Sequence, residues 1–183
     1  AAAINTLPGG LKHNKNATAE TIENNVRSKI IKEHLHDPAY YDKMSVLLDE
    51  IIAARKANAI EYEEYLQRIA ELAKKVQEGH ADDTPEPLKK SPALRALYNT
   101  LMVKYEEADT VSYPTAEYAA SGDTVLDLAI CVDTTVKNVR SDGWRGNTPK
   151  ENVIKGALYP VLGNDKAEVE RVFKVIEKHK DEY

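Results

Sequence analysis

The chain has 183 residues, of which 42% are hydrophobic and 30% are charged, and its formal net charge is -5. This length corresponds to about one domain and allows a buried core without disulfide bonds or a structural metal. The single cysteine, Cys131, excludes an internal disulfide framework and a cysteine-based zinc site. No apolar run approaches the roughly 18 residues of a membrane span and no secretory leader opens the chain, so we expect a soluble, cytoplasmic domain. Because the chain starts at Ala1 without an initiator Met, we expect it to be part of a longer polypeptide.

The charges are unevenly distributed along the sequence. Residues 37–90 carry eight Lys and Arg against twelve Asp and Glu, and residues 91–136 carry two against seven. Residues 1–36 carry five against three, and residues 137–183 carry ten against eight. Dedicated duplex-binding domains usually have a pI above about 9, whereas the pI here is near 5.6. A free-standing DNA-binding domain is therefore excluded, while a local basic strip within a larger assembly and an ordinary solvated helical surface both remain open.

The first half of the sequence predicts three helices. Residues 1–17 contain turn signals without periodicity, so we expect an irregular lead-in to the first helix. Apolar residues at three- and four-residue steps then predict a helix over about 18–35, a second that starts at Pro38 after Asp37, and a third after Asn58. Gly79 follows the third helix and is typical of a left-handed C-terminal cap.

The second half predicts four more helices. Residues 80–90 are expected to form a linker, and residues 103–122 an acidic insertion loop. Helices are expected after Ser91, from Asp123 or Thr124 to about 140, from a capping box that opens at Thr148, and after Asp165. No strand-like alternation occurs. We therefore predict an all-α fold, a single helical-bundle domain of about seven helices over residues 18–183.

Searches for catalytic patterns fail. None of the eight glycines belongs to a phosphate-binding loop or a dinucleotide fingerprint. His34 and His36 lie near Asp37, but a two-residue step on a helix points them to different sides, so a solvated pair fits better than a metal site. Cys131 has no histidine near it in sequence and is expected to be a half-buried thiol. We therefore predict no catalytic, cofactor-binding or metal-binding residue in this segment.

Tyrosine is unusually frequent, with ten tyrosines against one phenylalanine and one tryptophan. Tyrosine combines apolar area with a polar hydroxyl, which suits half-buried seams between helices and also protein interfaces. The sequence leaves both interpretations open.

The loop around the only tryptophan is a candidate contact site. Trp144 lies between Gly143 and Arg145, close to Arg140, and residues 137–155 carry five basic and two acidic side chains. Tryptophan and arginine are preferred at interface hot spots, and arginine also pairs with phosphate. The alternative is that Gly143 ends a helix and Trp144 fills the core, because a large aromatic side chain is usually buried.

Several segments, taken in order, resemble one known family. The sequence resembles the C-terminal helical domain of the motor (R) subunit of type I restriction enzymes over about residues 18–180. The segments that carry this resemblance are AETIENNVR at 19–27, YYDKMS at 40–45, LL at 47–48, YEEYL at 62–66, LRALY at 94–98 and DGWRG at 142–146. Residues 105–122 depart from the family pattern and are expected to be an insertion.

The resemblance implies a non-catalytic role in a bacterial, cytoplasmic assembly. In that family the nuclease core and two RecA-like domains precede this segment, so the parent chain is expected to be an ATP-dependent type I site-specific deoxyribonuclease that uses ATP and Mg. No cofactor is implied for this segment. The implied partners are the methyltransferase subunit, double-stranded DNA and the upstream helicase domains of the same chain, with no membrane.

The resemblance and the basic strip together nominate the candidate DNA or partner contacts. These are Glu20, Asn24, Asn25, Arg27, Lys137, Arg140, Asp142, Trp144, Arg145 and Lys150. Two hypotheses compete. An interaction module, which docks the motor subunit onto the methyltransferase core and contributes to DNA binding, predicts that Arg140, Arg145 and Lys150 share an exposed face. A purely structural cap on the motor domains predicts instead that Trp144 is fully buried.

Overall fold

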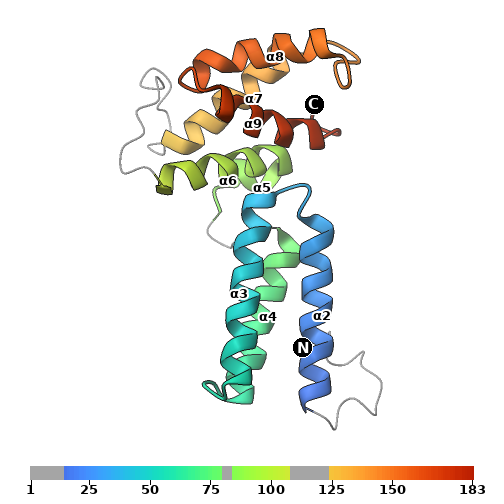
Figure 1. Ribbon diagram of the computed structural model, residues 1–183, viewed down its shortest axis with the longest axis vertical. Helices are drawn as coiled ribbons and strands as arrows, with labels where there is room; N and C mark the ends of the chain where they lie inside the picture. The colour runs from blue at the N-terminus through green and yellow to red at the C-terminus, as the bar shows by residue number, and fades with distance from the viewer. Residues whose placement is uncertain (1–14, 80–83, 108–123) are drawn as a thin grey trace. The chain divides into compact units, whose positions relative to one another are not determined.

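The computed structural model describes residues 15–79, 84–107 and 124–183, and all regular secondary structure in these ranges is helical. These residues form eight helices, which are labelled in Figure 1. They are α2 (Lys15–Glu33), α3 (Pro38–Lys56), α4 (Tyr62–Glu78), α5 (Glu86–Lys90), α6 (Pro92–Glu107), α7 (Thr124–Val139), α8 (Thr148–Val161) and α9 (Lys166–Lys178). The all-α fold predicted from the sequence is confirmed. No helix among the described residues is both long and apolar enough to cross a membrane.

Helix boundaries differ from the predicted ones in α2, α5 and α6, and also at the start of α8, which is described below. Helix α2 begins at Lys15, within the expected irregular lead-in, and α6 continues to Glu107, into the expected loop insertion. The short helix α5 occupies the second half of the expected linker. It carries one buried apolar side chain, Leu88, which is too few to produce a periodic signal. The remainder of the lead-in and of the insertion, residues 1–14 and 108–123, lies outside the described residues.

The chain divides into two compact units, each with its own hydrophobic core. Unit 1 comprises residues 1–35 and 40–83, and unit 2 comprises residues 36–39 and 84–183. Unit 1 therefore contains α2, nearly all of α3, and α4, and unit 2 contains α5 to α9. The two units are described separately below.

Unit 1 packs three helices around one apolar core. Helix α4 shows the simplest pattern, because its buried side chains Tyr65, Ile69, Leu72 and Val76 recur at three- and four-residue steps. Gly79 ends this helix with a left-handed φ of 71°, and its N–H donates to the main-chain oxygen of Lys75 at 2.9 Å. The cap predicted at Gly79 is confirmed.

The core of unit 1 also contains a buried ion pair. The Nε and Nη2 atoms of Arg55 on α3 donate to the two carboxylate oxygens of Glu23 on α2, at 2.8 and 3.3 Å. The Tyr65 hydroxyl lies 3.2 Å from Glu23 Oε1 and 3.2 Å from the main-chain oxygen of Ala19. Burial, followed by the nearby Glu23 charge, raises the pKa of Tyr65. This cluster ties one polar residue from each helix into the unit 1 core.

The tyrosines of unit 1 lie at the seams between helices. Tyr65 and Tyr41 are buried, and the ring of Tyr62 stacks on that of Tyr65 with 5.9 Å between centroids. The Tyr40 hydroxyl donates to the main-chain oxygen of Lys75 at 3.0 Å. Tyr40 and Tyr65 thus combine burial of the ring with a hydrogen-bonded hydroxyl, as expected for helix-packing edges.

Unit 2 packs α6, α7, α8 and α9 around the larger core, to which α5 contributes the buried Leu88. The cap of α8 lies one residue before the predicted one. Asn147, not Thr148, is the N-cap, and its side chain accepts a hydrogen bond from the Lys150 N–H at 3.3 Å. Glu151 Oε1 in turn accepts from the Gly146 N–H at 2.7 Å. Asn is at least as good an N-cap as Thr, which explains the shift.

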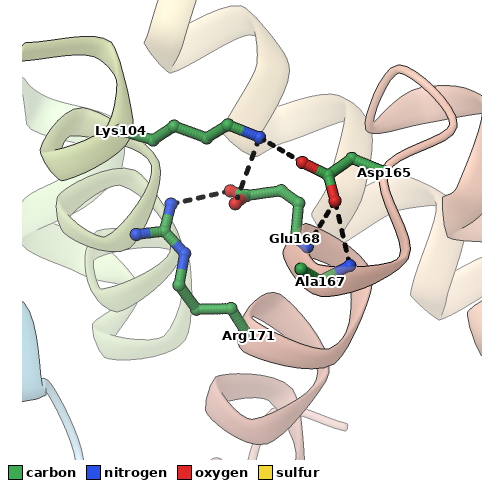
Figure 2. Close-up of polar contacts among 5 residues, drawn as sticks. All are labelled: Lys104, Asp165, Ala167, Glu168 and Arg171. Carbon is green, nitrogen blue, oxygen red and sulfur yellow. Dashed lines mark hydrogen bonds and ion pairs between the residues drawn. The ribbon is translucent and has the colours of Figure 1, made fainter. Parts of the chain in front are cut away.

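The predicted cap of α9 is confirmed and belongs to a charged cluster (Figure 2). Asp165 Oδ1 accepts from the N–H groups of Ala167 and Glu168, at 2.9 and 3.2 Å. Lys104 of α6 donates to Asp165 Oδ2 at 2.7 Å, and this hydrogen bond is the main cause that lowers the pKa of Asp165. Arg171 pairs with the buried Glu168 at 2.8 Å. The cluster joins α6 to the start of α9 inside unit 2.

Candidate functional site

The loop that carries Trp144 connects α7 to α8 in unit 2. Helix α7 ends at Val139, and Gly143 and Gly146 then adopt left-handed φ angles of 62° and 70°. No atom lies within 4 Å of where a Cβ would stand at either glycine, so the backbone conformation alone requires these residues. The Asn147 N–H donates to the main-chain oxygen of Trp144 at 3.1 Å and closes the turn.

Trp144 is part of the unit 2 core. Its side chain is 2% exposed, and its ring lies edge-on to Phe173 of α9 with 5.6 Å between centroids. Its Nε1–H donates to the main-chain oxygen of Tyr183 at 3.1 Å. The interpretation in which Trp144 fills the core is confirmed, and its indole presents almost no surface to a partner.

Arg145 holds the end of α9. Its guanidinium donates to three main-chain oxygens, those of Glu177, His179 and Tyr183, at 3.2 to 3.3 Å. It also lies 4.4 Å above the Trp144 ring. The last carbonyl groups of a helix have no partner within the helix and carry partial negative charge, so the half-buried Arg145 is a suitable hydrogen-bond donor for them. Burial, followed by repulsion from Arg140, lowers the pKa of Arg145.

Three basic side chains line one hollow beside this loop. The hollow encloses about 300 Å³ and is lined by residues 137, 140–145 and 183. Arg140 is exposed and donates to the main-chain oxygen of Tyr183 at 2.5 Å. Lys137 is exposed and pairs with Asp133 at 2.9 Å, and the Tyr183 hydroxyl donates to that same carboxylate at 2.6 Å. The fold thus gathers Lys137, Arg140 and Arg145 at one place.

Lys150 reaches the edge of the same hollow. Its Nζ donates to the main-chain oxygen of Asp142 at 2.5 Å, and its side chain is half-buried. The Asp142 side chain is exposed. Arg140 and Lys137 are thus the more exposed basic side chains at this site, and Arg145 and Lys150 are half-buried. Arg140, Arg145 and Lys150 all donate to main-chain oxygens, and Lys137 is paired with Asp133.

The other candidate contacts lie on α2 in unit 1. Glu20, Asn24 and Asn25 are exposed there. Arg27 donates to Asp49 of α3 at 2.6 Å, with both side chains at the surface. The candidate set is thus divided between the two units.

Sequence analysis missed a set of exposed apolar side chains. Large apolar residues are prominently exposed in unit 1 at Ile31 (67%), Leu35 (63%), Val46 (58%) and Leu47 (40%). In the sequence, Ile22, Val26 and Ile30 recur at four-residue steps and so lie on one side of the helix, whereas Ile31 and Leu35 do not fall on that side. This departure from a single apolar face could have indicated their exposure.

Neither histidines nor cysteine form a cluster with metal-binding geometry in the part of the chain that the structure describes. His34 Nε2 lies 2.8 Å from Asp42 Oδ1 in unit 1. His36 belongs to unit 2, where its main-chain oxygen lies 2.8 Å from His179 Nε2. Cys131 is half-buried, as predicted.

Comparisons of this chain with protein-family models, with curated proteins and with solved structures find no match. The resemblance to the restriction motor subunit therefore rests on the ordered sequence segments alone.

Proposed function

We propose that this chain is a non-catalytic helical domain of a type I restriction enzyme R subunit. In this role it docks the ATP-dependent motor and endonuclease subunit onto the methyltransferase core and contributes to DNA binding. The ordered segments over residues 18–180 support the proposal. The structural observation that carries it is the exposure of Ile31, Leu35, Val46 and Leu47 on and beside two helices of unit 1.

Exposed apolar side chains are ordinary when they are isolated. Here three of them are grouped, because Ile31 and Leu35 lie four residues apart and the pairs Arg27–Asp49 and His34–Asp42 bring this part of the chain beside Val46 of α3. Leu47 instead lines a hollow between α3 and α4. Apolar side chains grouped at a surface and surrounded by charged residues are typical of a protein interface. A docking domain accounts for them, whereas a domain that contacts no partner does not need them.

The basic side chains around the unit 2 hollow support the DNA half of the proposal. Lys137, Arg140 and Arg145 all line that hollow. Contacts of this kind engage phosphates and carry little sequence information. We expect the purified chain to bind duplex DNA weakly, with affinity that falls steeply as salt rises.

Two experiments test the two halves. The docking half is tested by assembly of the R subunit with the methyltransferase after deletion of residues 18–180, and unchanged assembly refutes it. The DNA half is tested by gel shift of the purified chain and of the double variant Lys137→Gln, Arg140→Gln. The control is Lys174→Gln, an exposed lysine of α9 away from the hollow. Equal binding by the double variant and the control refutes a role for the hollow.

A purely structural cap is the second candidate, and the burial of Trp144 and the engagement of Arg145 favour it. In that role unit 2 is a rigid support for the neighbouring motor domains. It predicts that deletion of residues 18–180 lowers the melting temperature of the motor while the surviving folded fraction still assembles with the methyltransferase. Loss of assembly without a change in motor stability contradicts the cap.

A further inference from the structure

Helix α2 carries apolar side chains on two faces, which distinguishes it from α4. Val26 and Ile30 are buried in the unit 1 core, whereas Ile31, about 100° around the helix from Ile30, is exposed. Leu35 continues the exposed apolar surface in the turn after the helix. In α4 the aliphatic residues Ile69, Leu72 and Val76 all lie on its buried face. A helix with apolar residues on two faces buries both when its partner is present.

The exposed side of α2 is a regular stripe. Glu20, Asn24, Arg27 and Ile31 follow one another at steps of four, three and four residues, which places them on one face of the helix. Three of these four, Glu20, Asn24 and Arg27, are among the positions that match the restriction-subunit family. This stripe lies next to the face that carries the buried Val26 and Ile30. Asn25 lies on a different face of the helix.

Helix α3 aligns its own exposed residues with this stripe. The ion pairs Arg27–Asp49 and His34–Asp42, at 2.6 and 2.8 Å, join the two helices in antiparallel order. Ile31 lies one turn after Arg27, and Val46 lies one turn after Asp42 and one before Asp49. Both apolar side chains therefore lie between the two ion pairs on the same side of unit 1. We call Arg27, Ile31, Leu35, Asp42, Val46 and Asp49 the α2–α3 face.

Carboxylates outnumber basic groups around this face. Asp42 and Asp49 are both well exposed, and Glu20 and Glu50 add two further exposed carboxylates on the same two helices. The basic groups are Arg27, which is paired with Asp49, and the exposed Lys43, which lies one turn before Val46. His34 is charged only when protonated. Carboxylates facing a second copy of the same surface repel it, and the phosphates of DNA are repelled as well. A surface that offers apolar side chains edged by Lys and Arg is complementary.

We propose that the α2–α3 face is the docking site for the methyltransferase partner, through a patch of that partner whose apolar side chains are edged by lysine and arginine. The apolar side chains of the patch cover Ile31, Leu35 and Val46, and its basic groups face Asp42 and Asp49. This inference rests on the docking role proposed above and assigns that role to one surface of unit 1.

The test measures assembly of the complete R subunit with the methyltransferase. The variants are Ile31→Asp and Val46→Asp, and the matched control is Val153→Asp, since Val153 of α8 in unit 2 is 59% exposed and so resembles Val46. Because the three positions are exposed, each variant is expected to fold, which circular dichroism checks. We expect about tenfold weaker assembly for each face variant and no change for the control.

A charge reversal tests the chemistry of the partner. Asp42→Lys is expected to weaken assembly more strongly at low salt than at high salt, because it places a positive charge against the basic edge of the partner. The control is Glu63→Lys, which reverses an exposed carboxylate on α4. Equal effects of the two reversals overturn the proposed charge complementarity.

The outcomes separate this inference from the proposed function. If deletion of residues 18–180 abolishes assembly while Ile31→Asp and Val46→Asp behave like Val153→Asp, the docking role stands and the α2–α3 face is the wrong surface. If the deletion leaves assembly unchanged, both fail. If the purified chain instead forms a dimer in sedimentation experiments that Ile31→Asp abolishes, the occupant is a second copy and the inference is overturned.

Discussion

Arg55 and Arg27 form two ion pairs within unit 1 that differ mainly in burial. The side chains of Arg55 and Glu23 are 13% and 8% exposed, whereas those of Arg27 and Asp49 are 40% and 61% exposed. In Arg55→Met the apolar stem remains and the guanidinium is lost. The Glu23 carboxylate is then left in the core with the Tyr65 hydroxyl near it. We expect this change to cost about 3–5 kcal/mol, because removal of one partner leaves an uncompensated buried charge.

The matched change at the surface is Arg27→Met. It leaves Asp49 in water, so we expect a loss of about 0–1 kcal/mol. Total stabilities of domains are about 5–15 kcal/mol, so the first variant removes a large part of the stability of unit 1 and the second does not. The double variant Glu23→Leu, Arg55→Met replaces the pair by apolar groups, and we expect it to recover much of the loss.

Urea unfolding followed by far-ultraviolet circular dichroism measures these differences, because unit 1 is largely helical. The only tryptophan, Trp144, lies in unit 2, so its fluorescence reports the unfolding of that unit and serves as an internal reference. If Arg55→Met proves no more destabilising than Arg27→Met, the argument from burial is refuted. The same holds if the double variant is less stable than Arg55→Met alone.

Three further predictions concern unit 2. Trp144→Ala is expected to cost about 3–5 kcal/mol, as for other buried aromatic residues, whereas the exposed Val153→Ala stays within about 0.5 kcal/mol; equal melting temperatures for the two variants contradict the burial of Trp144. Arg145→Met removes three hydrogen bonds to main-chain oxygens, and we expect a loss of about 2–3 kcal/mol in urea unfolding, against no measurable change for Lys174→Met. Burial is the main cause that lowers the pKa of His179, so the folded state favours the neutral ring. The contribution of His179 to the stability of the fold is therefore present above the unfolded pKa of about 6.5 and is lost as the pH falls below it. His179→Gln is expected to reduce the stability difference between about pH 7.5 and about pH 5.5, and an unchanged difference excludes His179 as its source.

Local features of the fold could be predicted from the sequence. The caps at Asp165 and Gly79 and the apolar stripe of α4 depend on residues within four positions of one another. Where the local sequence signal was short or ambiguous, the observed helix boundaries differ from the predicted ones. Leu88 alone gave α5 no periodicity, and Asn147 competed with Thr148 for the cap of α8.

The candidate site depended on contacts that are distant in sequence. The sequence left Trp144 and Arg145 open between partner contact and core packing. Their partners in the structure, Phe173 and the main-chain oxygens of Glu177, His179 and Tyr183, all lie more than 25 residues away along the chain. The residues next to Trp144 in the sequence do not indicate which of these distant residues it contacts.

Apart from the short helix α5, the sequence by itself indicated which described segments are helices, because helix formation depends on periodicity and caps within one or two turns. Only the tertiary structure decided which apolar residues each helix buries. Ile30 and Ile31 are chemically identical neighbours, yet one is buried in the core of unit 1 and the other is exposed. The choice between them follows from the positions of α3 and α4 around α2, since burial depends on the neighbours that long-range packing brings to each face.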